Sequence, residues 1–453
     1  MAGDAPDALP LEVDIRADVA IVGGGYVGLW TAIRIKELEP SCDVVVLEQD
    51  ICGGGASGRN GGFALSWWPK ISSLVKLCGT TDALRIAQDS EDAIDEIRQF
   101  SLRHGIDVHF RQAGWLWTAT SHAQLNAWEG VVRTCERMGT GVNAFLRLPN
   151  ADVARRSGSS AHRAGVLESR GATVHPAALV RGLRRVALEL GVRIYEQTRV
   201  GHIRRGAPVV LTTPNGTLTA ERLVIATNAW AAGMREFSRS IVAISSDVVV
   251  TEAVPEHFAR LGWTGGECIT DSQMMVCYYH VTRDGRLVFG KGGWGIAYAG
   301  NIGPDFDRNT SRMHTVVQDM HRYYPTLRDV AVTHDWSGPI DRTPNSLPLL
   351  GRFLAHPNIV YGVGWSGNGV APSVIGGRVL ASLALDRDDS WARYPLVNRS
   401  VGSFPPEPFR YVGAHIVRAA VASKERAEIE GRRASAIATR LSRLAPAGLE
   451  DKD

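Results

Sequence analysis

The chain has 453 residues, of which 44% are hydrophobic and 21% are charged, and its formal net charge is +3. This composition excludes a largely disordered, collagen-like or coiled-coil protein, and the length predicts about two to three domains. The near-neutral charge does not indicate a nucleic-acid-binding protein, which would concentrate basic residues on one face.

Nothing in the sequence predicts a membrane protein or a secreted one. No run of about 18 apolar residues is present, and the acidic, proline-containing start MAGDAPDALPLEVDIRAD does not resemble a secretory signal. The six cysteines never occur with C-x-x-C spacing. We therefore expect reduced thiols in a cytoplasmic protein, without a disulfide framework or a metal site.

The first predicted elements form a strand–turn–helix–strand unit. A strand of β-branched and small apolar residues covers Asp18–Val22, and a helical pattern runs from Tyr26 to about Leu38. A second strand, Val44–Leu47, ends at Glu48. This order is typical of a parallel sheet with helices on its faces.

The remaining elements are predicted less regularly along the chain. The segment 53–62 is too rich in glycine for a helix or a strand, two or three helices follow over 71–104, and strand and helix patterns mix over 108–148. A second βαβ-like block covers 172–200, with a strand that ends at Val200.

The later part of the chain is predicted to contain two hairpins and a helical tail. The turns of the hairpins are Asn215-Gly216 and Asp284-Gly285, dipeptides that favour tight hairpin turns. A third glycine-rich block, 362–377, leads into a helix. The charged stretch 405–445 predicts solvated helices that pack by one face.

The turn between the first strand and helix has the pattern G-x-G-x-x-G. Its glycines allow a tight turn, the approach of a pyrophosphate and close helix packing, and the helix N-terminus favours phosphate charge. An acid that can bind ribose hydroxyls follows 20 residues after the last glycine. These features predict a dinucleotide site, for NAD or FAD, at Gly23, Gly25, Tyr26, Val27, Gly28 and Glu48.

The glycine-rich block that follows the second strand favours FAD. It resembles the flavin-contacting segment of the glycine/D-amino-acid oxidase family, in which glycines let the main chain lie against a planar ring. Ser57 and Arg59 offer donors to phosphate oxygens. The resemblance predicts cofactor contacts at Gly55, Ala56, Ser57, Arg59, Asn60, Gly61 and Gly62.

The resemblance to this family extends over about residues 15–385 in the family's order. It implies adenine contact by backbone at Val200, a buried strand that closes on the cofactor, and a turn and helix start that face the flavin pyrimidine edge. The cofactor-binding residues implied by these last two segments are Thr227, Asn228, Trp230, Gly364, Gly367, Asn368, Gly369 and Val370.

Lys291 lies in a Gly-Lys-Gly-Gly sequence after the second hairpin turn. It resembles the position at which sarcosine-oxidase-like members hold a lysine over the flavin. An ammonium there would stabilise negative charge as O2 accepts electrons. The alternative is a solvated lysine at the end of a strand.

The segment 336–344 departs from the amino-acid-oxidising members of the family. Where they carry an arginine that clamps the substrate carboxylate, this chain has Ile340, followed by Asp341 and Arg342. The segment looks more like the branch that oxidises amines such as γ-glutamylputrescine. Asp341 could meet a cationic amine or cap a turn, and Arg342 could still bind a carboxylate.

Tyr278 and His280 are further candidates for the substrate site. They lie on the strand that faces the substrate in the family, and alternation places them on one face with Tyr279 on the other. The sequence leaves open which face lines the cavity. Some relatives attach FAD to a late cysteine or an early histidine, but Cys277 is the last cysteine and His104 the first histidine, which favours noncovalent FAD.

The sequence therefore predicts an α/β plus α+β flavoenzyme, with a Rossmann-type FAD-binding domain and an antiparallel-sheet substrate domain as in glycine oxidase. The predicted activity is oxidation of an amine to an imine that hydrolyses to a carbonyl compound, with O2 reduced to H2O2. The alternatives are an amino-acid oxidase or a dehydrogenase of the same family, a nicotinamide enzyme, and a non-catalytic flavoprotein. The predicted boundaries are 1–90, 150–235 and 335–385 for the FAD domain, 91–149 and 236–334 for the substrate domain, and 386–453 for a helical extension.

Overall fold

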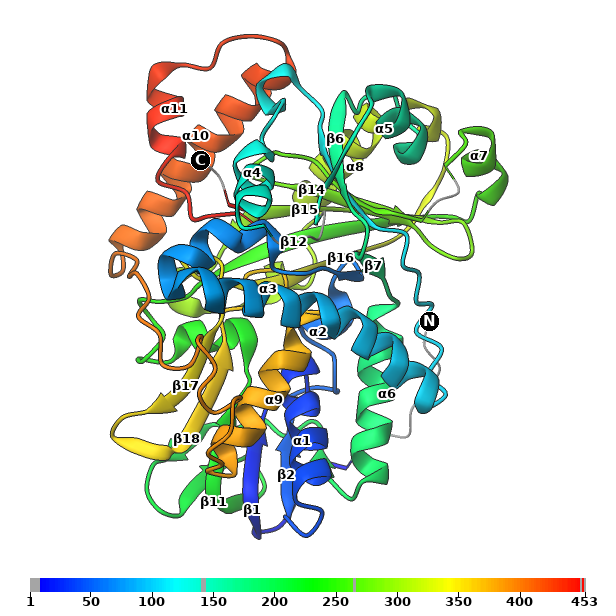
Figure 1. Cartoon of the computed structure of the whole chain (residues 1–453). Helices are drawn as coiled ribbons and strands as arrows, with labels where there is room; N and C mark the ends of the chain where they lie inside the picture. Colours follow the sequence, from blue (N-terminus) through cyan, green and yellow to red (C-terminus); the bar gives the residue numbers. More distant parts are fainter. Residues whose placement is uncertain (1–8, 140–143, 264–265, 449, 452–453) are drawn as a thin grey trace.

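Two large sheets dominate the structure, a computed structural model that describes residues 9–139, 144–263, 266–448 and 450–451. The first sheet lies in the lower half of Figure 1 and the second in the upper half, with helix α3 crossing between them. The prediction of a parallel-sheet cofactor unit combined with an antiparallel substrate sheet is confirmed.

The first sheet has a parallel centre. Its strand order is β17-β18-β11-β1-β2-β8, with β10 and β9 extending from β11, and the pairs from β18 to β8 are parallel. The strands are β1 (Ile15–Val22), β2 (Val44–Leu47), β8 (Arg193–Tyr195), β9 (His202–Arg204), β10 (Val209–Thr212), β11 (Thr217–Ile225), β17 (Leu349–Phe353) and β18 (His356–Val363).

Helices cover one face of this sheet. Helix α1 packs against both α6 and α9, and α3 packs against α9. Every residue of β2 is buried, because Val44 and Val46 pack in the core under the helices and Val45 and Leu47 pack in a second core on the other face. The helices are α1 (Tyr26–Leu38), α2 (Ala56–Arg59), α3 (Ile71–Arg103), α6 (Pro176–Glu189) and α9 (Pro372–Ala384).

The second sheet is antiparallel except where β13 pairs with β4. Its strand order is β16-β12-β15-β14-β13-β4-β6-β5. The strands are β4 (Trp115–Ala119), β5 (Leu146–Leu148), β6 (Ala164–Glu168), β12 (Val242–Thr251), β13 (Cys268–Thr270), β14 (Cys277–Val281), β15 (Leu287–Ile296) and β16 (Val332–Arg342).

One face of the second sheet packs against α8, and smaller helices surround its edges (Figure 1). Apolar and aromatic residues of β14, β15 and α8 form a separate core there, including Tyr279, Phe289 and Val316. The helices are α4 (Glu129–Arg137), α5 (Asn150–Ser157), α7 (Pro255–Arg260) and α8 (Thr310–Tyr323). A short pair, β3 (Phe63–Ala64) with β7 (Ala172–Thr173), forms a third sheet.

Strand pairing corrects two of the predicted domain boundaries. Strands β6 and β16 lie in segments that the prediction gives to the cofactor domain, but both hydrogen-bond within the second sheet. The reason is that β16 pairs along its length with β12, a contact between segments about 90 residues apart that local sequence does not reveal.

The predicted elements otherwise lie close to the observed ones. Both hairpins form, and α3 contains a non-helical residue at Gly79, which divides it into two helices. Two predictions are wrong in detail: the glycine-rich block 53–62 contains the one-turn helix α2, and the strand predicted to end at Val200 ends at Tyr195.

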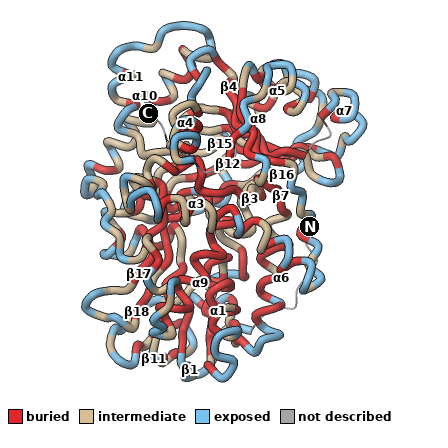
Figure 2. The backbone as a smooth tube through the Cα atoms, viewed as in Figure 1, coloured by how far each residue is buried: buried red, intermediate tan, exposed pale blue. Residues whose placement is uncertain are grey.

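The C-terminal region forms α10 (Phe409–Ile429) and α11 (Ala436–Ser442), which pack on each other, and α10 also packs against β15. Buried backbone runs through both sheets and the helices between them, whereas the outer loops and much of α10 and α11 are more exposed (Figure 2). Within the described part of the chain, no helix combines the length and apolarity needed to cross a membrane.

Candidate functional site

A cavity of about 1100 Å³ lies between the two sheets and receives residues from both. Its first half follows the carboxyl ends of β1, β2 and β11, the edge at which parallel sheets bind dinucleotides. Its second half is lined by β12, β14 and β16 of the other sheet. Typical ligand cavities measure about 300–1,000 Å³, so this one has room for an extended cofactor together with a small substrate.

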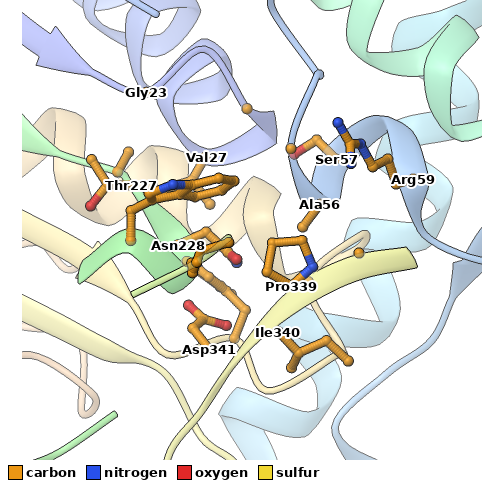
Figure 3. Close-up of a pocket in the computed structure, with 18 of the residues that line it drawn as sticks. Gly23, Val27, Ala56, Ser57, Arg59, Thr227, Asn228, Pro339, Ile340 and Asp341 are labelled. Atoms are coloured by element: carbon orange, nitrogen blue, oxygen red, sulfur yellow. The ribbon is translucent and has the colours of Figure 1, made fainter. Parts of the chain in front are cut away.

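The strand–turn–helix unit borders the first half of the cavity, where Gly23 and Val27 lie (Figure 3). Gly23, Gly25, Tyr26 and Val27 line the cavity, as predicted from the glycine pattern. Gly28 does not line it: a Cβ there would lie 1.9 Å from the carbonyl oxygen of Gly23. The last glycine of the motif therefore lets α1 approach the turn, and it makes no direct cavity contact.

Glu48 lines the cavity at the end of β2 and also holds the turn in place. One carboxylate oxygen accepts the N–H of Gly24 at 2.7 Å and the other accepts the N–H of Asp50 at 3.0 Å. Burial raises the pKa of Glu48, and these two backbone donors oppose the increase. Each oxygen retains a second lone pair that can accept a ribose hydroxyl.

The glycine-rich block lines the cavity through Gly55, Ala56, Ser57, Asn60 and Gly61. The Ser57 hydroxyl accepts the N–H of Tyr26 at 2.9 Å, so it lies at the start of α1 (Figure 3).

Arg59 and Gly62 of this block are predicted as cofactor contacts, and the structure gives each of them a further role. Arg59 lines the cavity, but its guanidinium forms an ion pair with Asp307. Gly62 does not line the cavity, has φ +77°, and would place a Cβ 2.3 Å from the carbonyl oxygen of Val174. It is required for backbone packing.

The end of β11 supplies buried polar atoms without a protein partner. Thr227 and Asn228 line the cavity with Trp230, and Val200 lines it from a neighbouring loop. The Thr227 hydroxyl and the Asn228 side-chain oxygen are buried and lack hydrogen-bond partners among the described residues. Since buried polar groups are normally paired, these atoms fit a polar cofactor.

The block before α9 lines the cavity through Gly367, Asn368, Gly369 and Val370. Gly364 is the exception: its φ is +84°, and a Cβ there would lie 2.5 Å from a Thr343 methyl group. This glycine allows the turn and does not contact the cavity, which corrects its predicted role.

Asp341 lines the cavity, but its carboxylate anchors that same turn. It accepts the N–H of Gly364 at 2.5 Å and the N–H of Ser366 at 3.2 Å. Burial raises its pKa to about 6, although these backbone donors favour the charged form. Of the two interpretations left open by the sequence, the contacts match the turn-anchoring one.

Tyr278 and His280 lie on the same face of β14, as the alternation predicts, and Tyr279 packs in the core on the opposite face. Tyr278 lines the cavity, and its hydroxyl lies 2.7 Å from the Ser246 hydroxyl. His280 is not among the described lining residues. The ring of His280 is buried, and its centroid lies 5.8 Å from that of the Phe63 ring. This burial lowers the pKa of His280 to about 4.

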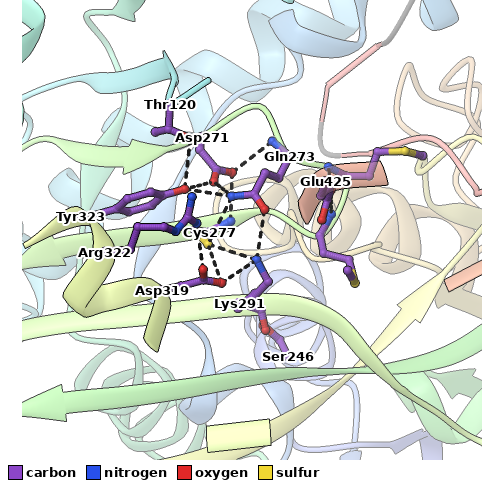
Figure 4. Close-up of polar contacts among 12 residues, drawn as sticks. Thr120, Ser246, Asp271, Gln273, Cys277, Lys291, Asp319, Arg322, Tyr323 and Glu425 are labelled. Atoms are coloured by element: carbon purple, nitrogen blue, oxygen red, sulfur yellow. Dashed lines mark hydrogen bonds and ion pairs between the residues drawn. The ribbon is translucent and has the colours of Figure 1, made fainter. Parts of the chain in front are cut away.

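Lys291 lies in the middle of β15, and its side chain points towards Asp319 and Gln273 (Figure 4). Its Nζ lies 2.9 Å from an Asp319 carboxylate oxygen, and it donates to the Gln273 side-chain oxygen at 3.3 Å. Gln273 lines the cavity, whereas Lys291 is not among the described lining residues. The alternative of a solvated lysine at a strand end is wrong, because β15 continues past Lys291 and its side chain is buried towards α8. The role in O2 reduction stays a prediction.

Several lining residues are absent from the sequence predictions. Gln273, Met274 and Val276 come from the loop between β13 and β14, and Gly448 and Glu450 come from the region after α11. The Glu425 carboxylate of α10 accepts the N–H groups of Met274 and Met275, which joins the C-terminal helix to that loop. No local motif marks these residues; only their tertiary position does.

Comparisons with known proteins agree with this geometry. Residues 18–383 match the family model of FAD dependent oxidoreductases, DAO. Gamma-glutamylputrescine oxidoreductase from Escherichia coli K12 is 31% identical over 411 residues, covering 89% of this chain and 92% of that protein. A probable oxidoreductase OrdL from Rhizobium meliloti is 30% identical over 375 residues, covering 82% and 84%.

The fold is also similar to that of solved structures. The crystal structure of glycine oxidase from Geobacillus kaustophilus matches with a TM-score of 0.69 at 22% sequence identity, covering 85% of this chain and all of that one. This similarity supports the same combination of a cofactor sheet and a second, mainly antiparallel sheet.

Proposed function

Because the chain belongs to the DAO family of FAD-dependent oxidoreductases, we propose that it oxidises the C–N bond of an amine that carries no α-carboxylate. Bound FAD would accept two electrons from that bond, and water would hydrolyse the resulting imine to a carbonyl compound. The reacting amine must be neutral, since its lone pair becomes part of the C=N bond.

The observation that carries this proposal is the state of the 340–342 segment. Ile340 presents an apolar side chain to the cavity (Figure 3), and Asp341 is occupied by backbone N–H groups. The Arg342 guanidinium donates to the Ser346 hydroxyl at 2.9 Å and to the Ala447 carbonyl at 3.0 Å. Both of these hydrogen bonds come from Nη1, so one arm of the guanidinium is held by the protein although Arg342 lines the cavity. None of the three residues therefore offers all the donors of a guanidinium fork to a substrate carboxylate.

Other lining residues are suited to hold the cofactor and substrate. The unpartnered atoms of Thr227 and Asn228 and the Glu48 carboxylate would bind the FAD end of the cavity. We propose noncovalent FAD, because the described lining residues include no cysteine and one histidine, His202. Tyr278, held by Ser246, would orient the substrate.

An anaerobic flavin-bleaching assay tests the substrate class. Each amine is compared with its matching α-amino acid, for example ethylamine with alanine, at equal concentration. A buried carboxylate without a partner costs a few kcal/mol, so the amine should reduce the flavin at least tenfold faster. Faster bleaching by the amino acid in most pairs would contradict the proposal and support an amino-acid oxidase.

We propose O2 as the electron acceptor, with H2O2 as its two-electron product. Stopped-flow mixing of the amine-reduced enzyme with O2 measures this step directly, and a peroxidase-coupled assay measures the H2O2. A reduced flavin that is stable in air but reoxidised by a quinone would assign a dehydrogenase.

A further inference from the structure

The region after α11 reaches the cavity although it lies outside the part of the chain that matches the family model. We call residues 444–448, 450 and 451 the C-terminal segment. Gly448 and Glu450 line the cavity, and Glu450 is only 2% exposed. Contacts on both sides of Glu450 attach this segment to separate parts of the fold.

Ala447 provides the first attachment, at the end of β16. Its carbonyl accepts hydrogen bonds from the Arg342 guanidinium at 3.0 Å and from the Ser346 hydroxyl at 2.7 Å. Its N–H donates to the carbonyl of Pro344 at 3.3 Å. The C-terminal segment therefore accepts a hydrogen bond from Arg342, the one arginine in residues 336–344.

Asp451 provides the second attachment, at the start of α3. Its N–H donates to the carbonyl of Pro69 at 2.8 Å, and its carboxylate accepts the N–H of Ser73 at 2.8 Å. The Lys70 Nζ lies 3.3 Å from an Asp451 carboxylate oxygen and donates to the Glu450 carbonyl at 3.4 Å. Lys70 is 1% exposed, so Asp451 is the counter-ion of a buried ammonium.

The C-terminal segment adds two negative charges next to two cations at this end of the cavity, where Asp341 is a further carboxylate beside Arg342. Arg342 and Lys70 carry two positive charges, and Glu450 and Asp451 carry two negative ones. Burial lowers the pKa of both Arg342 and Lys70, and the Glu450 charge opposes this lowering at both residues. Without the segment, Arg342 and Lys70 would each lose a carboxylate neighbour, and Arg342 would have more donors available for a carboxylate from solution.

We propose that the C-terminal segment determines substrate specificity by holding the Nη1 arm of the Arg342 guanidinium and placing the Glu450 carboxylate in the cavity wall, so that substrates with an α-carboxylate next to the reacting amine are rejected. This inference rests on the proposed function, because it explains the preference for amines. The Nη1 group of Arg342 is held by Ala447 and Ser346, so this arginine has fewer donors left to clamp an amino-acid substrate.

Acetate binding to the oxidised, FAD-loaded enzyme tests the proposal without turnover. Acetate is titrated at constant ionic strength, with chloride as the balancing anion, and binding is followed by the change in the flavin absorption spectrum. The variants are Glu450→Gln and a truncated chain ending at Arg443. Glu430→Gln, which removes an exposed carboxylate paired with Arg432, is the charge control.

We expect acetate to bind at least tenfold more tightly to the truncated enzyme than to the full chain, and about threefold or more tightly to Glu450→Gln. The control should match the wild type. Adding Arg342→Gln to the truncated chain should remove the gain, since the guanidinium is the proposed acetate partner.

Unchanged acetate affinity in the truncated enzyme, with FAD retained, would overturn the proposal. If truncation prevents FAD retention, Glu450→Gln decides: no gain in acetate affinity overturns the proposal. The acetate-binding test does not require turnover. If no amine bleaches the flavin, the proposed function is contradicted, but the acetate affinities still decide the role of the C-terminal segment.

Discussion

Individual buried charges in this protein have roles that their residue type does not reveal. Lys291 and Asp319 form an ion pair behind the cavity wall, and Arg322 also donates to Asp319 at 2.8 Å. Asp341 anchors a turn through backbone donors. By contrast, Glu168, at the end of β6, is 1% exposed, and burial raises its pKa to about 7.

Glu168→Gln should make the protein more stable above pH 7. The folded-state pKa lies above the ordinary 4.5, so the folded protein favours the protonated acid. The stabilisation that the protonated Glu168 contributes to the folded state is complete below pH 4.5 and is lost as the pH rises through 7. The shift corresponds to about 3 kcal/mol, which we expect as the gain for the variant at pH 8 in urea unfolding.

The same pair of proteins should have nearly equal stability at pH 4.5, where the native acid is neutral. Comparing variant with wild type at both pH values removes the contribution of other titrating groups. Equal unfolding free energies at pH 8 would contradict a buried, energetically costly Glu168 carboxylate.

Lys291→Met should lower the free energy of unfolding by about 3 kcal/mol, near the lower end for breaking a buried ion pair, because Arg322 still pairs with Asp319. Denaturant unfolding measures this loss. Stopped-flow reoxidation of the reduced flavin by O2 tests a second role of Lys291. If the variant is reoxidised about a hundredfold more slowly than the wild type, this supports the predicted role in O2 reduction. An unchanged reoxidation rate would leave the residue a structural one.

At the scale of elements, close approach of backbone segments shapes the cofactor half of the cavity. Helix α1 begins directly after the turn at Gly25, and Gly28 lies against the carbonyl of Gly23. In the other sheet, the pairing of β14 with β15 places Gly290 against the Tyr278 ring, and Gly61 of the glycine-rich block lies against the same ring. Small residues at these contacts allow the elements to pack.

Gly28→Ala should therefore cause loss of FAD. A Cβ at this position would lie 1.9 Å from backbone, which cannot move as a side chain can, so α1 must shift away from the turn. The absorbance ratio of FAD to protein after purification measures the effect. Gly413→Ala in α10 is the matched control, since its Cβ would meet nothing within 4 Å.

The control should keep its FAD and gain about 0.5–1 kcal/mol of stability, because alanine favours a helix over glycine. A full complement of FAD in Gly28→Ala would show that the turn tolerates displacement and would contradict this account of the motif.

At the scale of the whole molecule, the cavity joins the two sheets, the α9 turn and the C-terminal segment. A ligand there contacts parts of the chain that are far apart in sequence. Such a ligand binds the folded state and not the unfolded chain, so it stabilises the whole fold by mass action.

Removing FAD should lower Tm, and added FAD should raise it in a concentration-dependent way. At a free FAD concentration about 100 times Kd, the stabilisation is about 2.7 kcal/mol. Differential scanning calorimetry of stripped and reconstituted protein measures the shift, with AMP as a control for binding at the adenine end alone. A Tm independent of FAD would contradict a cofactor site between the sheets.

The sequence by itself determined the local units of this protein. Helix α1 and strand β2 have the bounds predicted from periodicity, both hairpins turn at the predicted dipeptides, and most predicted cofactor residues line one cavity. The bounds of these elements and their turns depend on residues near one another in the chain, through glycine turns and the alternation of apolar residues. The cofactor residues were found from motifs that resemble those of a known family.

The tertiary structure decided the rest. Alternation showed that Tyr278 and Tyr279 face opposite sides of β14, but only packing of α8 against the sheet placed Tyr279 and Lys291 on the covered side. Likewise, Arg342 is bound by Ala447, about 105 residues later in the chain. Such contacts are absent from sequence patterns because a strand's periodicity repeats every two residues whichever face is buried, and a distant partner leaves no local signal.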